Sequence, residues 1–106
     1  MGKILHFRQL EVWQEAHKLV LMVYRSTEGF PGHERFGLVS QMRRAAVSVP
    51  ANVVEGFKRQ GIGDKIRFYN IAEGSLEELK YYFILSKGLG YVSSNDDLAA
   101  QADTVG

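Results

Sequence analysis

The chain has 106 residues, of which 45% are hydrophobic and 24% charged, and it contains no cysteine. This length suits one folded domain over residues 1–106, and the composition is ordinary for a soluble globular protein. The lack of cysteine excludes disulfides, thiolate zinc sites and cysteine nucleophiles. No apolar run approaches the roughly 20 residues of a membrane-spanning helix, so we expect a cytoplasmic protein.

The first predicted helix runs from about Arg8 to Ser26. Apolar residues recur there at steps of three and four, beginning with Leu10 and Trp13, and neither glycine nor proline interrupts them. The following segment, 27–32, contains two glycines that flank a proline, which predicts a loop.

The second predicted helix begins near His33 or Glu34, where an acidic residue suits the positive end of the helix dipole, and ends near Phe57. An apolar stripe runs along it and keeps its phase across a proline; the stripe is formed by Met42, Ala45, Val49 and Val53. A proline inside a helix costs about 3 kcal/mol because it lacks the N–H donor and crowds the preceding turn. We nevertheless predict one continuous helix, bent at Pro50.

The third predicted helix has Asp64 as its N-cap and reaches about Lys87. Gly74 lies in its middle, next to Ser75, and the pair would leave a shallow notch on the helix surface. We expect the small-residue segment around Pro50 to pack closely against that notch.

Ser94 and Asp97 approximate a capping box, which predicts a fourth helix of only about three turns before Gly106. Because the loops are short and every long element is helical, the predicted fold class is all-α, an antiparallel up-down-up-down four-helix bundle with a short fourth helix. Such a short helix leaves apolar surface for another subunit to cover. We therefore expect a homo-oligomer.

The net charge is only +1, but the charges are unevenly distributed. The segment 35–67 carries seven basic residues against Glu55 and Asp64, whereas the segment 68–106 carries six acidic residues against Lys80 and Lys87. Two interpretations follow. The two segments pair with each other, inside the fold or between subunits, or the basic segment forms a solvent-facing patch.

The polar face of the second helix also admits two interpretations. Arg44 and Glu55 lie three turns apart, so each needs a partner elsewhere, with Glu73 or Glu77 as the nearest candidates. The structural interpretation is a polar network, at a subunit interface, formed by Gln41, Arg44, Asn52, Glu55, Glu73 and Glu77. The functional interpretation is a patch that contacts nucleic-acid phosphates, formed by Arg43, Lys58, Arg59, Lys65 and Arg67.

No sequence motif indicates catalysis. The histidines His6, His17 and His33 lie in separate contexts, and the chain has no Glu-x-x-His pair of the kind that di-metal bundles use. Nucleophile-elbow and phosphate-loop motifs are also absent from the sequence. We therefore expect no enzyme activity, no metal and no cofactor.

Four stretches resemble one known family; they are Leu10 to Ala16, Phe36 to Leu38, Gln41 to Gly56 and Ile71 to Leu79. They resemble the four-helix-bundle proteins encoded by intervening sequences in bacterial 23S ribosomal RNA genes, a family that includes the accessory variability protein of diversity-generating retroelements. The resemblance covers residues 7 to about 105. It implies an antiparallel bundle that assembles into a ring-like homopentamer, and a nucleic-acid role like that of the retroelement relatives.

The sequence therefore predicts a non-enzymatic, self-assembling helical bundle whose further partner is RNA or DNA, held through its phosphates without base specificity. The alternative is a structural or protein-interaction module that binds no nucleic acid.

Overall fold

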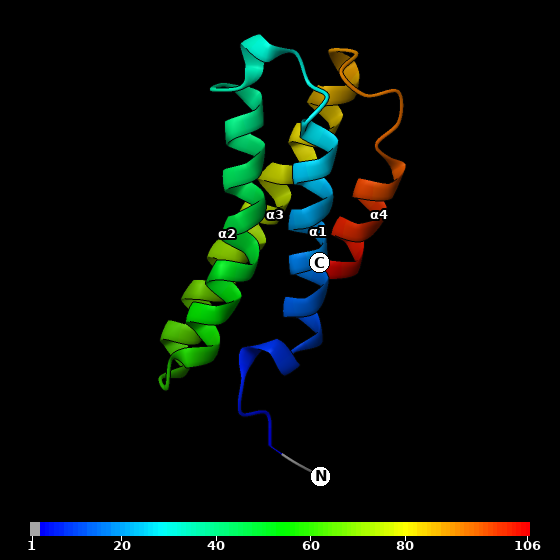
Figure 1. Cartoon of the computed structure of the whole chain (residues 1–106). Helices are drawn as coiled ribbons and strands as arrows, with labels where there is room; N and C mark the ends of the chain where they lie inside the picture. Colours follow the sequence, from blue (N-terminus) through cyan, green and yellow to red (C-terminus); the bar gives the residue numbers. More distant parts are fainter. Residues whose placement is uncertain (1–2) are drawn as a thin grey trace.

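A computed structural model describes residues 3–106, and every regular element in that range is helical. The four α-helices are α1 (Glu11–Thr27), α2 (Leu38–Lys58), α3 (Ile62–Gly88) and α4 (Asp96–Val105), and two 3₁₀ turns, η1 (Phe7–Gln9) and η2 (Gly32–Glu34), precede α1 and α2. The predicted all-α class is confirmed. Figure 1 shows the α1–α2 and α3–α4 connections at one end of the molecule and the α2–α3 turn at the other.

The molecule is elongated, with extents of 46 × 25 × 18 Å. α2 and α3 share the most extensive contact, and α4 packs on α1 and α3 without touching α2. The core draws residues from all four helices, and the largest hydrophobic side chains that are fully buried are Leu19, Val23, Met42, Val49, Leu79 and Phe83. None of the described helices is long and apolar enough to cross a membrane.

The start of the first helix differs from the prediction. The backbone is extended at Leu10, so residues 7–9 form a separate 3₁₀ turn and α1 begins at Glu11. The turn has its own cap, because His6 Nδ1 accepts a hydrogen bond from the Arg8 N–H and Gln9 Oε1 accepts one from the His6 N–H. A periodic apolar pattern cannot reveal this local break.

The second helix begins at Leu38 rather than at His33 or Glu34. Glu34 ends the turn η2, and its Oε1 accepts a hydrogen bond of 3.2 Å from the Leu38 N–H. The carboxylate therefore satisfies one of the free donors at the first turn of α2. Gly37 lies between the two residues, and an added Cβ there would approach Glu34 Oε1 to 2.8 Å, so glycine leaves room for this cap.

α2 then runs without a break through Pro50, as predicted, and Pro50 is itself buried. The predicted contact at the Gly74–Ser75 notch is wrong at Gly74, which is exposed and has nothing within 4 Å of an added Cβ, but it holds at Ser75. The close approach of α2 and α3 occurs at Gly56, which packs against the Tyr69 ring, and at Ser48, whose hydroxyl lies 2.8 Å from that of Ser75.

Two predicted caps are also wrong. Gly61 is the N-cap of α3, and Asp64 lies in its first turn, where it still faces the positive end of the helix dipole. Asn95 is the N-cap of α4, and no capping box joins Ser94 to Asp97. The Asn95 amide instead donates a hydrogen bond of 2.6 Å to the carbonyl oxygen of Phe83, which ties the connection to α3.

Candidate functional site

The predicted basic patch centres on the turn between α2 and α3, and one of its members, Lys65, has a structural role there. Lys65 Nζ donates hydrogen bonds of 3.0 Å to the carbonyl oxygens of Gly56 and Phe57. These carbonyls belong to the last turn of α2, where they have no partner within the helix and where a cation suits the negative end of the dipole. Lys65 therefore acts as a C-terminal cap for α2.

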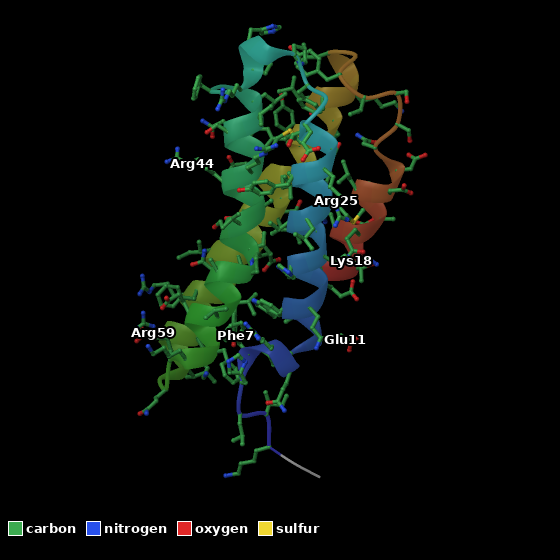
Figure 2. The ribbon with its side chains drawn as sticks, viewed as in Figure 1. Phe7, Glu11, Lys18, Arg25, Arg44 and Arg59 are labelled. Carbon is green, nitrogen blue, oxygen red and sulfur yellow. The ribbon has the colours of Figure 1, made fainter. Side chains whose placement is uncertain are left out.

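Two of the remaining cations of the turn lie over one aromatic ring. The Arg59 and Arg67 guanidinium groups lie 4.7 and 4.5 Å from the centroid of the Phe68 ring. Arg59 also forms an exposed ion pair of 3.0 Å with Glu55, one helical turn earlier. Lys58 is exposed and precedes Arg59 in the chain, and Figure 2 shows Arg59 at the outer edge of this end of the bundle. The structure thus brings Lys58, Arg59 and Arg67 together as an exposed group, which we call the basic turn.

Arg43 does not belong to that group. It lies fifteen residues before Lys58 on the same helix, a rise of about 22 Å. Its Nε donates a hydrogen bond of 3.0 Å to Thr27 Oγ1, and its guanidinium lies 4.5 Å from the centroid of the Tyr24 ring. The same guanidinium donates a hydrogen bond of 3.3 Å to the Tyr24 carbonyl oxygen. Arg43 therefore joins α2 to the last turn of α1.

The predicted polar network does not close within the chain. Glu55 pairs with Arg59 and Glu77 pairs with Lys80 at 3.2 Å, each inside its own helix. The Asn52 amide donates hydrogen bonds to the carbonyl and hydroxyl oxygens of Ser48, also within α2. No side-chain hydrogen bond or ion pair involves Gln41, Arg44 or Glu73 in the part of the chain that the structure describes. Their role at a subunit interface stays a prediction.

The polar contact that does join α2 to α3 was missed by the sequence analysis. Ser48 and Ser75 share a hydrogen bond of 2.8 Å, and Asn52 donates to the same Ser48 hydroxyl at 3.0 Å. Ser75 belongs to the predicted notch, but the helical spacing gives no reason to pair its hydroxyl group with that of Ser48. A small polar residue beside the apolar stripe of each helix is the signal that could have found this pair.

An open groove lies beyond the end of α4, which stops about halfway along α1 in Figure 1. Its volume is about 510 Å³, and it is lined by all four helices, by the residue before α1 and by Gly106; its apolar side chains include Leu10, Val12, Val53, Tyr69, Leu76 and Val105. Glu73, Glu77 and Lys80 of α3 also line it. Lys80 donates to Glu77 and lies 3.6 Å from Asp103, and the first of these contacts is the main reason that its pKa is raised. We call this feature the α4-end groove.

A second, shallower hollow of about 760 Å³ lies on the other side of the molecule, over α2 and the end of α1. Its charged and apolar lining includes Arg35, Phe36, Arg43, Arg44 and Val47. Phe36 is 88% exposed, and the Arg35 guanidinium lies 5.4 Å from the centroid of its ring.

Among residues 3–106, no group of three or more histidine, aspartate and glutamate side chains could hold a metal ion. The fold and these surfaces define an all-helical bundle protein with an exposed basic turn and an open apolar groove. The chain belongs to the family of 23S rRNA-intervening sequence proteins, whose family model matches residues 8–106. The resemblance seen in the sequence is therefore confirmed. No curated protein shows a significant match to the chain.

Proposed function

We propose that this chain is a non-enzymatic, self-assembling helical bundle, and that its assembly binds RNA or DNA phosphates through the basic turn. The assembly is a ring-like homopentamer of antiparallel up-down-up-down bundles, as the family resemblance implies. The observation that carries the nucleic-acid part is the grouping of Lys58, Arg59 and Arg67 as exposed cations at one end of the bundle. The cytoplasmic location expected from the sequence belongs to the same proposal.

The distribution of ion pairs supports self-assembly. Three salt bridges form in the described chain, Arg59–Glu55, Lys80–Glu77 and Lys80–Asp103, and none joins the basic segment 35–67 to the acidic segment 68–106. Pairing of the two segments inside the fold is thus not seen among residues 3–106. If the basic and acidic segments pair, they therefore pair between subunits. Such pairing would give Arg44 and Glu73 ionic partners on a neighbouring subunit.

The geometry of the turn supports phosphate contact without base specificity. The charges of Lys65 and Arg43 are directed at helix-end oxygens, so the available patch is narrower than the predicted one. Three cations alone provide few phosphate contacts, and their binding would weaken steeply with salt. A ring repeats the patch on every subunit, and simultaneous contacts then raise the overall affinity well above that of one turn.

Fluorescence anisotropy with labelled RNA and DNA of mixed sequence tests the nucleic-acid part. We expect binding at low ionic strength. The logarithm of the binding constant should then fall linearly with the logarithm of the salt concentration. The variant Lys58→Glu/Arg67→Glu should lose this binding and keep its assembly state. The variant Lys18→Glu/Arg25→Glu is the matched control, because it makes the same charge change at exposed positions of α1 (Figure 2).

The outcomes separate the two classes of function. If the wild-type protein retains neither RNA nor DNA at low salt, the nucleic-acid part fails and the structural or protein-interaction module takes its place. If the variant at Lys58 and Arg67 loses assembly, those residues belong to the structure rather than to a ligand site.

A further inference from the structure

The hollow over α2 carries positive charge without a compensating carboxylate. Three arginines line it, and none of the described residues around it is acidic. Arg43 is already engaged, because its guanidinium donates hydrogen bonds to Thr27 and to the Tyr24 carbonyl oxygen. Arg35 and Arg44 are exposed and form no ion pair in the described chain. The chemistry of the hollow therefore suits an anionic ligand.

An exposed aromatic ring lies at the same hollow. Phe36 is 88% exposed, and the Arg35 guanidinium lies 5.4 Å from the centroid of its ring. A flat ring in water with an arginine beside it is the arrangement on which unpaired nucleic-acid bases stack. Bases in a duplex are already stacked on one another, so such a ring selects single strands.

The hollow and the basic turn are joined by one side of α2. The residues that helical spacing places along this side, at steps of three and four, are Arg44, Val47, Ala51, Glu55 and Lys58. The rise from Arg44 to Lys58 is about 21 Å. Figure 2 shows Arg44 and Arg59 projecting from the same side of the molecule. The one carboxylate in this series, that of Glu55, is paired with Arg59 at 3.0 Å, so it leaves no free negative charge on the path.

We infer that a single strand of RNA or DNA lies along this side of α2, from the basic turn to Phe36. One base stacks on the Phe36 ring, and the adjacent phosphates contact Arg35 and Arg44. This inference rests on the proposed nucleic-acid binding and adds unpaired strands as the ligand class and a second set of contacts. It assigns Arg44 to a phosphate rather than to a carboxylate of a neighbouring subunit.

Fluorescence anisotropy with three labelled ligands of equal length tests the stacking contact. The ligands are an oligouridine strand, an oligothymidine strand and a duplex of the oligothymidine with its complement. We expect Phe36→Leu to weaken the binding of both single strands at least about five-fold, as the loss of one stacked base does. Duplex binding should not change. An effect on one strand alone also supports the inference and identifies that strand as the ligand. The control Tyr81→Leu alters another exposed aromatic residue and should change none of the three.

A strand of abasic sites separates stacking from charge, because it keeps the phosphates and lacks the bases. It should bind the wild type and Phe36→Leu equally. Arg44→Ala should weaken the binding of intact and abasic strands alike and reduce the salt slope by about 0.7, the value for one phosphate contact on a single strand. Arg25→Ala, at an exposed position of α1, is the matched control and should leave the slope unchanged.

The outcomes distinguish this inference from the proposed function. If the wild type binds nucleic acid and both Phe36→Leu and Arg44→Ala leave that binding unchanged, the inference is overturned and the basic turn keeps its role. If the wild type binds no nucleic acid, the proposed function itself fails. Both positions are exposed, so circular dichroism should show unchanged helix content. Loss of assembly in either variant, measured by light scattering, would make this side of α2 a subunit interface and would also overturn the inference.

Discussion

Gly56 of α2 packs directly against the ring of Tyr69 in α3. A Cβ added to Gly56 would lie 2.7 Å from Tyr69 Cδ1 and 2.9 Å from Cζ, closer than real side-chain contacts. The absence of a side chain at this position sets how near the two helices come beside their connecting turn. Tyr69 also lines the α4-end groove, so the same contact fixes one of its walls.

Two glycine substitutions should therefore have opposite effects. Gly56→Ala gains about 0.5–1 kcal/mol of helix propensity but forces the Tyr69 ring aside, and overpacking typically costs about 1–3 kcal/mol. We expect a net loss of about 1 kcal/mol. Gly74→Ala makes the same backbone change where an added Cβ meets nothing within 4 Å, so it should stabilise by about 0.5–1 kcal/mol.

Urea unfolding at one fixed protein concentration measures both glycine effects. Repeating Gly56→Ala in a Tyr69→Ala background removes the ring, so the alanine should then be neutral or stabilising. A stabilising Gly56→Ala in the otherwise wild-type chain would contradict the close contact.

Lys65 and Lys58 should separate structure from ligand binding. Lys65→Met keeps the aliphatic stem but removes the charged donor from the carbonyl oxygens of Gly56 and Phe57. We expect a loss of about 1–2 kcal/mol, the range for hydrogen bonds from a charged group at a helix end. Lys58→Met changes an exposed side chain and should stay within about 0.5 kcal/mol of the wild type.

The same two lysine variants, assayed for RNA binding, should show the reverse order. Lys58→Met should weaken binding more than Lys65→Met, because the Lys65 charge already faces the helix end. Equal stabilities in urea for the two variants would show that Lys65 does not cap α2.

The sequence predicts the helices of this protein much better than their ends. Apolar periodicity fixed the existence and burial of α1, α2 and α3, because the same stripe that forms the core also repeats in the sequence. The predicted starts of α2 and α4 were wrong because a side chain makes a hydrogen bond across the turn that precedes each helix. The Glu34 side chain reaches forward to the Leu38 N–H, and the side chain of Asn95, the N-cap residue of α4, reaches back to the Phe83 carbonyl rather than to the first N–H groups of α4. Such contacts depend on how a loop folds, and no spacing rule encodes that.

The candidate site shows a similar division. The cluster of cations around the α2–α3 turn was visible from composition alone, and three of the five predicted residues do group there. Lys65 and Arg43 look like the others in the sequence, yet each donates to backbone carbonyls at a helix end. Whether a cation is free depends on the position of those carbonyls, which follows from packing between helices rather than from the local sequence.

The Glu34–Tyr91 contact should make stability depend on pH in two ranges. The Tyr91 hydroxyl donates a hydrogen bond of 2.7 Å to Glu34 Oε2, and this bond, with that from the Leu38 N–H, lowers the pKa of Glu34. A carboxyl group whose pKa is lowered by folding stabilises the protein above its unfolded pKa, and that contribution is lost as the pH falls through the folded pKa. The same hydrogen bond raises the pKa of Tyr91, whose contribution is present below its unfolded pKa and is lost as the pH rises through the folded pKa.

Tyr91→Phe removes the shared hydrogen bond and should be less stable than the wild type between about pH 5 and pH 9, where Glu34 is ionised and Tyr91 is neutral. The difference should shrink as the pH falls from the ordinary carboxyl range through the lowered pKa of Glu34, and as it rises from the ordinary phenol range through the raised pKa of Tyr91. Urea unfolding midpoints of Tyr91→Phe and the wild type, measured from acid to alkaline pH, test both the acid and the alkaline dependence. Tyr81→Phe is the control, because Tyr81 is 56% exposed and its hydroxyl donates no hydrogen bond among the described residues. A stability difference for Tyr91→Phe that stays constant from acid to alkaline pH would mean that the ring, rather than its hydroxyl bond to Glu34, is what the fold needs.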